Sequence, residues 1–169
     1  LELNLYRNND IAFGTLCHKL LEYLSRSKTN NTEQLLNYGQ LLLKQAGFSP
    51  DQITYYMTDI QTLLHNVEID DNGQWLLQCR DEAHSEFSVT LLENNQPRTY
   101  RIDRVFTDNG TRWIIDYKFS KTDPDNIAAF LQIQKQLYTP QLKKYAQALN
   151  TLNQKKTRMA LYFPLIPYF

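Results

Sequence analysis

The chain has 169 residues, of which 42% are hydrophobic and 12% aromatic, and its formal net charge is zero. This length and composition indicate a globular domain with a core of its own and exclude an intrinsically disordered chain. No apolar run is long enough to cross a bilayer and no signal-peptide pattern begins at Leu1, so we expect a cytoplasmic protein that makes no contact with a membrane.

The first part of the chain predicts helices. Apolar residues recur at helical spacing over 10–26, with Asp10 as the expected N-cap. A second helix is expected over 32–46, and a third begins with Pro50 at its first position. We interpret the second and third helices as an inserted helical hairpin, within a helical part that covers about residues 10–66.

The two cysteines are not arranged for metal binding. Cys17 lies within the first helical pattern, and Cys79 is far from it and outside any CxxC motif. Such cysteines are typical of a reducing compartment, and they argue against a zinc site or an iron–sulfur cluster.

The second part of the chain predicts a sheet with two further helices. Runs rich in β-branched and aromatic residues predict strands over 75–80, 87–92, 98–106, 112–119 and 158–163. Helices are expected over 123–136 and 139–152, each started by a proline. This order of elements predicts a mixed α/β fold with a largely hairpin-built sheet, whose core covers about residues 74–163 of a single domain.

Two of these strands flank Asn109-Gly110, the centre of a predicted β-hairpin. Counting outward from this turn puts Asp103 directly opposite Asp116. Two facing carboxylates destabilise a hairpin unless a cation lies between them. Lys118 lies two positions after Asp116 and therefore projects from the same face of the strand.

Two acids and a lysine on one face are what a metal-dependent, phosphodiester-cleaving site requires. Carboxylate oxygens are typical ligands of Mg²⁺ and Mn²⁺, and a bound ion activates water and neutralises charge that develops on a phosphate. Lys118 can then position the water or stabilise the transition state. The alternative is a surface ladder of salt bridges, in which Arg101 and Lys118 flank the two acids.

Four further residues are candidates for the same site. His18 lies beside the apolar stripe of the first helix, and Glu86 lies at the head of a strand, where it is a further candidate metal ligand. Gln141 and Tyr145 are four positions apart and share one helix face, where they can bind phosphate or order a metal-bound water. A surface histidine and an ordinary amphipathic helix are the alternatives.

Basic residues gather in the last quarter of the chain. No Asp or Glu follows Asp125, whereas six basic residues do: Lys135, Lys143, Lys144, Lys155, Lys156 and Arg158. This segment predicts either a DNA-facing surface or a solvated helix face. Lys143 and Lys144 are candidate DNA contacts, as are Arg104 and Tyr138.

Taken together, these residues resemble the RecB-like branch of the PD-(D/E)XK nucleases, which have a restriction-endonuclease-like core. The branch has a GxxxH helix, an ID strand, a DYK strand and a QxxxY helix, which resemble Gly14-Thr-Leu-Cys-His18, Ile102-Asp103, Asp116-Tyr117-Lys118 and Gln141-Leu-Lys-Lys-Tyr145. Each motif is short, but the four occur in the family's order and on the predicted types of element.

The resemblance implies an αβββαβ core in which His18, Asp103 and Asp116 bind Mg²⁺ or Mn²⁺. It also implies that the backbone carbonyl of Tyr117 completes the metal shell and that Lys118 is the catalytic lysine. Domains of this branch usually form the C-terminal part of UvrD-like helicase–nucleases. We therefore expect a DNA exonuclease domain that is a fragment of a larger helicase–nuclease and acts in DNA end processing and recombinational repair. Its expected partners are the helicase domains of its own chain or of another polypeptide in the same complex.

Two features depart from the family pattern. Tyr100-Arg101 stand where a glycine often precedes the first aspartate strand, which hardly affects the site, and the cysteines of the iron–sulfur members are missing, which excludes that subgroup. The rival interpretations are a free-standing nuclease of the same superfamily and a catalytically vestigial DNA-binding module of a helicase complex. The joint presence of all the motif residues argues against the vestigial site.

Overall fold

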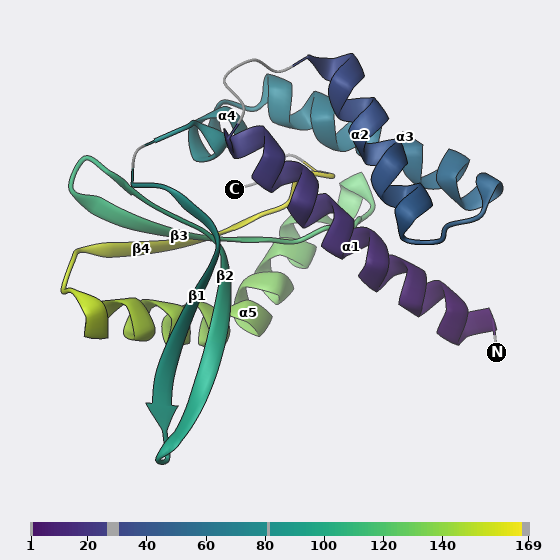
Figure 1. The fold of residues 1–169 in the computed structure, drawn as a ribbon. Coiled ribbons are helices and arrows are strands. Elements are labelled where there is room, and N and C mark those ends of the chain that lie inside the picture. The colour runs from purple at the N-terminus through teal and green to yellow at the C-terminus, as the bar shows by residue number, and fades with distance from the viewer. Residues whose placement is uncertain (1, 27–30, 81, 167–169) are drawn as a thin grey trace. The chain divides into compact units, whose positions relative to one another are not determined.

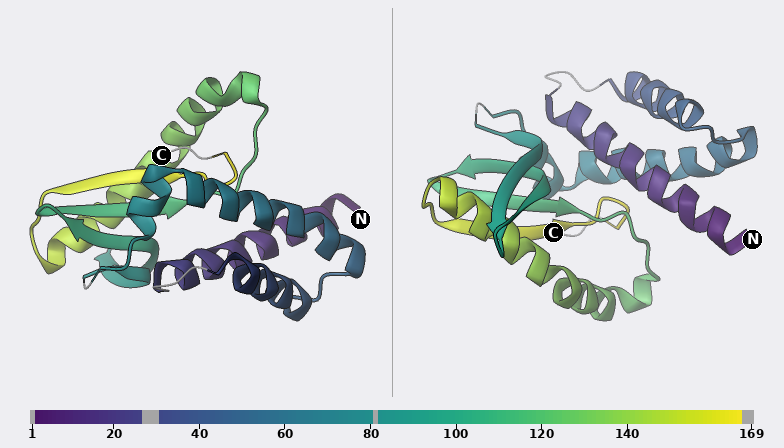
Figure 2. Two further views of the ribbon diagram at one scale, coloured as in Figure 1. Left: turned by 90° about the horizontal axis from the view of Figure 1, so that it is seen from above. Right: turned by 60° about the horizontal axis from the view of Figure 1, so that its bottom comes forward.

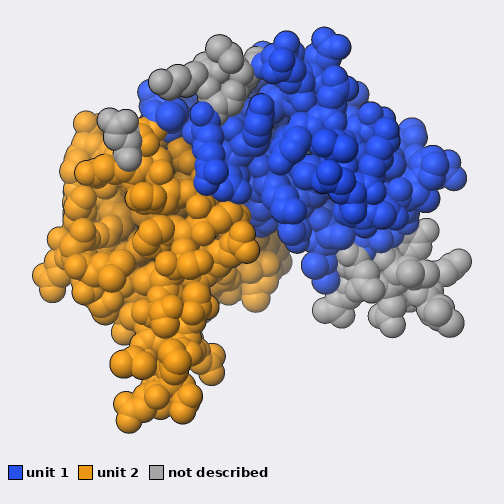
Figure 3. All heavy atoms as spheres, in the orientation of Figure 1, with its two compact units in different colours: residues 1–79, 163–168 blue, residues 80–162, 169 orange. Residues whose placement is uncertain are grey.

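The computed structural model describes residues 2–26, 31–80 and 82–166, and the chain divides into two compact units (Figures 1 and 3). Unit 1 contains residues 1–79 and 163–168, and unit 2 contains residues 80–162 and 169. Helices dominate unit 1, whereas unit 2 contains a sheet and one long helix. None of the helices in the described ranges is long and apolar enough to span a bilayer.

Helix α1 (Glu2–Arg26) starts earlier than the sequence predicts. Asp10 therefore lies inside the helix, and the prediction that it caps the helix is wrong. Its carboxylate instead accepts a 2.9 Å hydrogen bond from the hydroxyl of Tyr56. The ring of Tyr56 also stacks on Phe13, with 4.5 Å between the ring centroids. Asp10 thus serves a contact between two helices and does not cap the N-terminus of a helix.

The predicted helical hairpin is present as α2 (Thr32–Gln45) and α3 (Pro50–Ile69) (Figure 1). Both hydrogen bonds of a capping box, centred on Ser49, begin α3. Gly39 of α2 lies against Ile60 of α3, and a Cβ atom at Gly39 would come within 3.0 Å of Ile60 Cδ1. The glycine therefore permits the close packing of the two helices.

Residues 75–80 do not form the predicted strand. They lie in and directly after α4 (Asp71–Leu77), which Asp70 begins by accepting hydrogen bonds from the N–H groups of Asn72 and Gly73. An apolar run this short does not distinguish a strand from a buried helical turn. The capping aspartate decides the conformation here, because it satisfies N–H groups that a helix start leaves without partners.

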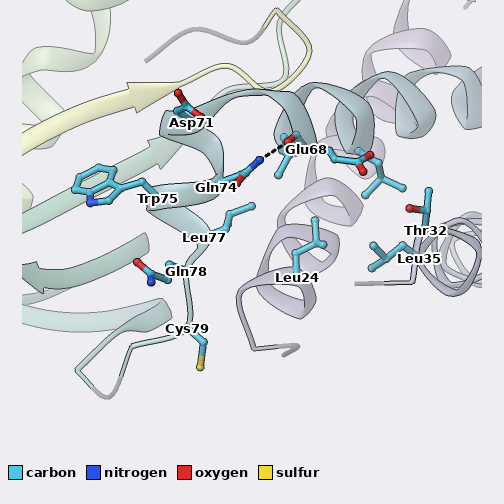
Figure 4. Close-up of a pocket in the computed structure, with 12 residues that line it drawn as sticks. Leu24, Thr32, Leu35, Glu68, Asp71, Gln74, Trp75, Leu77, Gln78 and Cys79 are labelled. Carbon is cyan, nitrogen blue, oxygen red and sulfur yellow. Dashed lines mark hydrogen bonds between the residues drawn. The ribbon is translucent and has the colours of Figure 1, made fainter. Parts of the chain in front are cut away.

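A hollow of about 630 Å³ opens in unit 1 beside α4 (Figure 4). Its walls come from all four helices of this unit, and its lining combines leucine and valine side chains with the acids Glu68 and Asp71. None of the described residues that line it is a site residue predicted from the sequence.

Unit 2 contains a four-stranded sheet in the order β1-β2-β3-β4. The strands are β1 (His84–Glu93), β2 (Gln96–Asp108), β3 (Thr111–Tyr117) and β4 (Thr157–Tyr162). The first three pair antiparallel, whereas β4 runs parallel to β3, as a crossover through a helix allows. Together with α1 and the crossover helix, this order gives the predicted αβββαβ core.

The hairpin between β2 and β3 has the predicted register. Asn109 and Gly110 both have a positive φ, 48° and 72°, as a two-residue type I′ turn requires. The strands then pair residue by residue, from Asp108 opposite Thr111 as far as Arg104, without a bulge. The count outward from the turn is therefore confirmed over this stretch.

Helix α5 (Ile127–Leu152) replaces the two helices predicted between the third and fourth strands. A short 3₁₀ helix, η1 (Pro124–Asn126), precedes it, and Pro140 lies inside it. Proline lacks an N–H and often ends a helix, which is why the sequence predicts two helices, but here the helix continues through Pro140 and its buried residues all follow the proline. The core of unit 2 joins α5 to the sheet and contains Val89, Ile102, Val105, Ile114, Leu142, Tyr145, Ala148 and Leu149.

Arg112 fastens the C-terminal end of α5 to the sheet. Its side chain is buried, and its guanidinium donates 3.1 Å hydrogen bonds to the side chain of Asn150 and to the carbonyl of Asn153. Burial lowers the pKa of Arg112, but an arginine remains charged at any ordinary pH. This anchor fixes α5 along the sheet and with it the side chains that α5 carries.

Candidate functional site

Three acids lie side by side on adjacent strands of unit 2. The β2–β3 register, continued by one residue, puts Asp103 opposite Asp116. The β1–β2 pairing has the same register on both sides of Glu86 and Asp103, so these two residues also lie opposite each other. Glu86, Asp103 and Asp116, here called the carboxylate row, therefore occupy one level of three neighbouring strands.

The backbone is distorted where β1 joins the carboxylate row. Glu86 has a φ of 54°, in the left-handed region that residues other than glycine rarely adopt. Its carboxylate oxygen lies within 4.8 Å of one from Asp103. Asp103 also accepts a 2.6 Å hydrogen bond from the N–H of Tyr117. Strained backbone of this kind gathers at functional sites, where it serves to orient a side chain.

Burial and mutual repulsion oppose the ionisation of these acids. Burial, together with the charges of Asp116 and Glu86, raises the pKa of Asp103 to about 8, although the N–H of Tyr117 and the charge of Lys118 lower it. Burial also raises the pKa of Asp116, although Lys118 lowers it. A divalent cation among the three carboxylates would offset both effects. Carboxylate oxygens whose negative charge is not fully compensated by neighbouring groups are suitable ligands for a hard divalent cation such as Mg²⁺ or Mn²⁺.

Two basic residues pair with the carboxylate row. Lys118 Nζ lies 2.6 Å from Asp116 Oδ2, and Arg101 forms an ion pair with Glu86. The backbone N–H of Lys118 donates a 2.9 Å hydrogen bond to the carbonyl of Tyr162, which holds the lysine beside β4. The side chains of Lys118 and Asp116 are only 18% and 3% exposed. This burial argues against a surface ladder of salt bridges at Asp116.

Helix α5 brings a hydrogen-bonding pair to the same acids. The side-chain amide of Gln141 donates to the hydroxyl of Tyr145. Burial raises the pKa of Tyr145, and the charges of Asp116 and Asp103 raise it further, although the bond from Gln141 lowers it. The tyrosine therefore lies within the electrostatic field of the carboxylate row and stays a neutral hydrogen-bond donor.

A residue that the sequence did not assign to the catalytic site also faces Lys118. The ring of Tyr138 lies on α5 with its centroid 4.0 Å from Lys118 Nζ. Sequence reasoning considered Tyr138 only as a DNA contact. Its position three residues before Gln141 and seven before Tyr145 was the available signal, since residues at these spacings share one helix face.

The remaining predicted residues lie on α1, β2, β3 and α5. His18 is half-buried on α1, which belongs to unit 1, and its role as a metal ligand stays a prediction, as does that of the Tyr117 carbonyl. Arg104 is only 2% exposed and donates a 3.1 Å hydrogen bond to Ser85, a placement that does not suit the predicted contact with DNA. Lys143 and Lys144 are exposed on α5, as a DNA-facing surface requires.

Comparison with known proteins identifies the family to which this architecture corresponds. The family model described as the PD-(D/E)XK nuclease superfamily matches residues 3–166. The chain is also 23% identical over 155 residues to one of the ATP-dependent helicase/nuclease subunits of Lactobacillus acidophilus (strain ATCC 700396 / NCK56 / N2 / NCFM). That match covers 85% of this chain and 13% of the relative. The predicted superfamily is thereby confirmed, and the relative is consistent with its RecB-like branch.

Proposed function

The chain belongs to the PD-(D/E)XK nuclease superfamily, and we propose that it is a Mg²⁺- or Mn²⁺-dependent DNA exonuclease domain. The observation that carries this proposal is the carboxylate row, Glu86, Asp103 and Asp116, with Lys118 paired to its third member. Buried carboxylates this close together are stable only when protons or cations compensate their charge. A row of this kind therefore suits a divalent cation and, beside it, a phosphate.

Oxygen atoms of the carboxylate row would hold the ion, with His18 and the carbonyl of Tyr117 as the further ligands that the family resemblance implies. When bound, such an ion supplies Lewis-acid activation of a water molecule and neutralises charge on the phosphate. The hydrogen bond from the N–H of Tyr117 orients Asp103, so the carboxylate is held in place before any ligand arrives.

The neighbouring side chains have roles that follow from their own chemistry. Lys118 holds an ammonium 2.6 Å from Asp116, where it can donate a hydrogen bond to an attacking water or to a phosphate oxygen. Tyr145, whose raised pKa keeps its hydroxyl protonated, and Gln141 can orient the same water or bind a second phosphate oxygen. Together these groups position a nucleophile and stabilise negative charge.

The exonuclease activity and its biological setting rest on the family resemblance and on the relative, which is part of a helicase/nuclease. We propose that the two units work together as one nuclease domain of a larger helicase–nuclease, and that its substrate is a DNA end exposed for repair or recombination. The vestigial-module rival is less well supported, because Asp103, Asp116, Lys118, Gln141 and Tyr145 all remain.

A cleavage assay with two forms of DNA tests this function. Linear DNA with a label at one end and covalently closed circular DNA, each single- or double-stranded, are incubated with Mg²⁺, Mn²⁺ or chelator. We expect release of short products from linear DNA only, and only with a divalent metal. Cleavage of closed circles would show an endonuclease instead.

Two variants complete this assay. Asp116→Ala removes a member of the carboxylate row, whereas Asp125→Ala removes an exposed acid before α5 and serves as its matched control. Activity should be lost in the first and kept in the second. Cleavage that persists in chelator, or in Asp116→Ala, would contradict the metal-dependent mechanism. A wild-type protein that binds DNA but never cleaves it would favour the vestigial module.

A further inference from the structure

Tyr138 extends the Gln141–Tyr145 face of α5 by one helical turn. Residues three and seven positions apart lie on the same side of a helix, so Tyr138, Gln141 and Tyr145 form one continuous edge. The far end of this edge lies in the field of Asp103 and Asp116. Its near end is the ring of Tyr138, whose centroid is 4.0 Å from Lys118 Nζ. All of these residues belong to unit 2.

The ammonium of Lys118 is held from two sides. Asp116 Oδ2 lies 2.6 Å away, and the face of the Tyr138 ring contributes a cation–π contact. A lysine has a long, flexible stem and many rotamers, so a single ion pair does not define where its ammonium points. The ring adds the second contact that limits this freedom.

An aromatic ring is a suitable partner at this place for an electrostatic reason. It attracts a cation through its quadrupole but carries no charge of its own. A carboxylate there would have been a fourth acid beside Glu86, Asp103 and Asp116, and would have raised the repulsion among them. The attraction between Asp116 and Lys118 also weakens whenever Asp116 shares its charge with another cation, whereas the contact with the ring remains.

We propose that Tyr138 is a positioning residue for Lys118: its ring holds the ammonium in the orientation in which the lysine acts on the attacking water or on the phosphate. This inference rests on the proposed nuclease function. The contact uses the ring face, so phenylalanine at position 138 serves equally well and leucine does not. The hydroxyl of Tyr138, which a DNA contact would use, is not required.

The test compares Tyr138→Phe and Tyr138→Leu with a matched control, Leu137→Ala, which alters a neighbouring side chain of α5 that is 61% exposed. The measurements are kcat and KM on linear DNA and the melting temperature with and without Mn²⁺. We expect Tyr138→Leu to lower kcat about tenfold, equivalent to about 1.4 kcal/mol of lost transition-state stabilisation. Its KM and its Mn²⁺-dependent rise in melting temperature should match those of the wild type. Tyr138→Phe and the control should keep the wild-type kcat.

A second measurement needs neither DNA nor metal. Protons that lie over a ring face are shifted upfield in NMR spectra, so the methylene group next to Nζ of Lys118 should be shifted in protein with isotope-labelled lysine. Lys118→Arg removes this signal and assigns it. The shift should persist in Tyr138→Phe and collapse in Tyr138→Leu. A signal at the ordinary lysine position in the wild type would overturn the placement of the ammonium over the ring.

The kinetic outcomes separate this inference from the proposed function. If the wild type and Tyr138→Leu cleave DNA at the same rate, the positioning role of Tyr138 is overturned, whereas the nuclease proposal stands. Equal losses in Tyr138→Phe and Tyr138→Leu would assign the effect to the hydroxyl and would overturn it too. A purely structural role would lower the metal-free melting temperature of Tyr138→Leu together with its activity. A wild type without metal-dependent cleavage would overturn the nuclease proposal, and the positioning role with it.

Discussion

The carboxylate of Asp103 accepts a 2.6 Å hydrogen bond from the backbone N–H of Tyr117, the residue that follows Asp116. This bond fastens β2 to β3 at the level of the carboxylate row. By itself it would favour the ionised form of Asp103. Burial outweighs it, since the pKa of Asp103 is raised to about 8. Without a cation, Asp103 is therefore largely protonated at neutral pH.

The metal-free protein should consequently lose stability as the pH rises. The pKa of Asp103 is about 8 in the folded state and about 3.9 in an unfolded chain. Between these values the folded state binds more protons than the unfolded state, so the stabilisation is complete below about pH 4 and is lost as the pH rises through about 8. The side chain in Asp103→Asn cannot ionise, so this variant should lose less stability than the wild type as the pH rises. Melting temperatures from pH 5 to 9 in chelator measure this, and parallel curves for the two proteins would contradict it.

A bound divalent metal should reverse the order of the melting temperatures of the wild type and Asp103→Asn. At high pH without metal, Asp103→Asn should melt higher than the wild type, because it removes one of two facing charges. With Mn²⁺ at a hundredfold excess over Kd, the wild type should gain about 2.7 kcal/mol of unfolding free energy, and the variant should lose most of that gain. Asp125→Asn, at an exposed acid, is the matched control. A wild-type melting curve that ignores both Mn²⁺ and Mg²⁺, even with an uncleavable duplex present, would argue strongly against an assembled site.

Replacement of the lysine should separate chemistry from metal binding. Lys118→Ala should abolish cleavage yet leave metal affinity nearly unchanged, because an ammonium donates hydrogen bonds but does not bind a hard cation. Lys135→Ala, which removes an exposed lysine of α5, should change neither property. Calorimetric titration with Mn²⁺ and single-turnover cleavage measure the two effects. Wild-type cleavage by Lys118→Ala would show that the assigned role is wrong.

Local signals predicted the part of the fold that forms the site. The turn at Asn109-Gly110 needs positive φ at both residues, and few sequences provide it, so the turn and the register of β2 and β3 follow from the sequence. This register brings Asp103 and Asp116 to the same level, where directly opposite residues project from the same face of the sheet. The place of Glu86 could not be derived in this way. It depends on a left-handed residue inside β1 and on the pairing of β1 with β2.

Two of the wrong predictions have the same physical cause, which is that contacts between residues distant in the sequence decide between local alternatives. Asp10 accepts a hydrogen bond from the hydroxyl of Tyr56 and does not start a helix. The strand predicted over 75–80 fails for a local reason instead, because Asp70 starts α4 by accepting hydrogen bonds from residues two and three positions away. Pro140 lies within α5, whose C-terminal half is held by the core of unit 2 and by Arg112. The partners of Asp10 and Arg112 lie 46 and 38 positions away and are not visible in a short window of sequence.

The basic residues on α5 give the last prediction, which concerns DNA binding and not catalysis. Lys143→Ala with Lys144→Ala should weaken DNA binding and flatten its dependence on salt, because each lost phosphate contact lowers the slope of log K against log salt by about 0.9. Lys144 lies 3.7 Å from Glu93, which neutralises part of its charge, so the loss in slope should be nearer one contact than two. Lys19→Ala with Lys44→Ala makes the same change of net charge at positions of unit 1 and is the matched control. The slopes are measured by DNA titrations at several salt concentrations, with every protein also carrying Lys118→Ala so that the substrate is not cleaved.

An unchanged slope in the α5 variant would mean that these lysines form only a solvated helix face. An equal loss in the control would mean that net charge, and not this surface, attracts DNA.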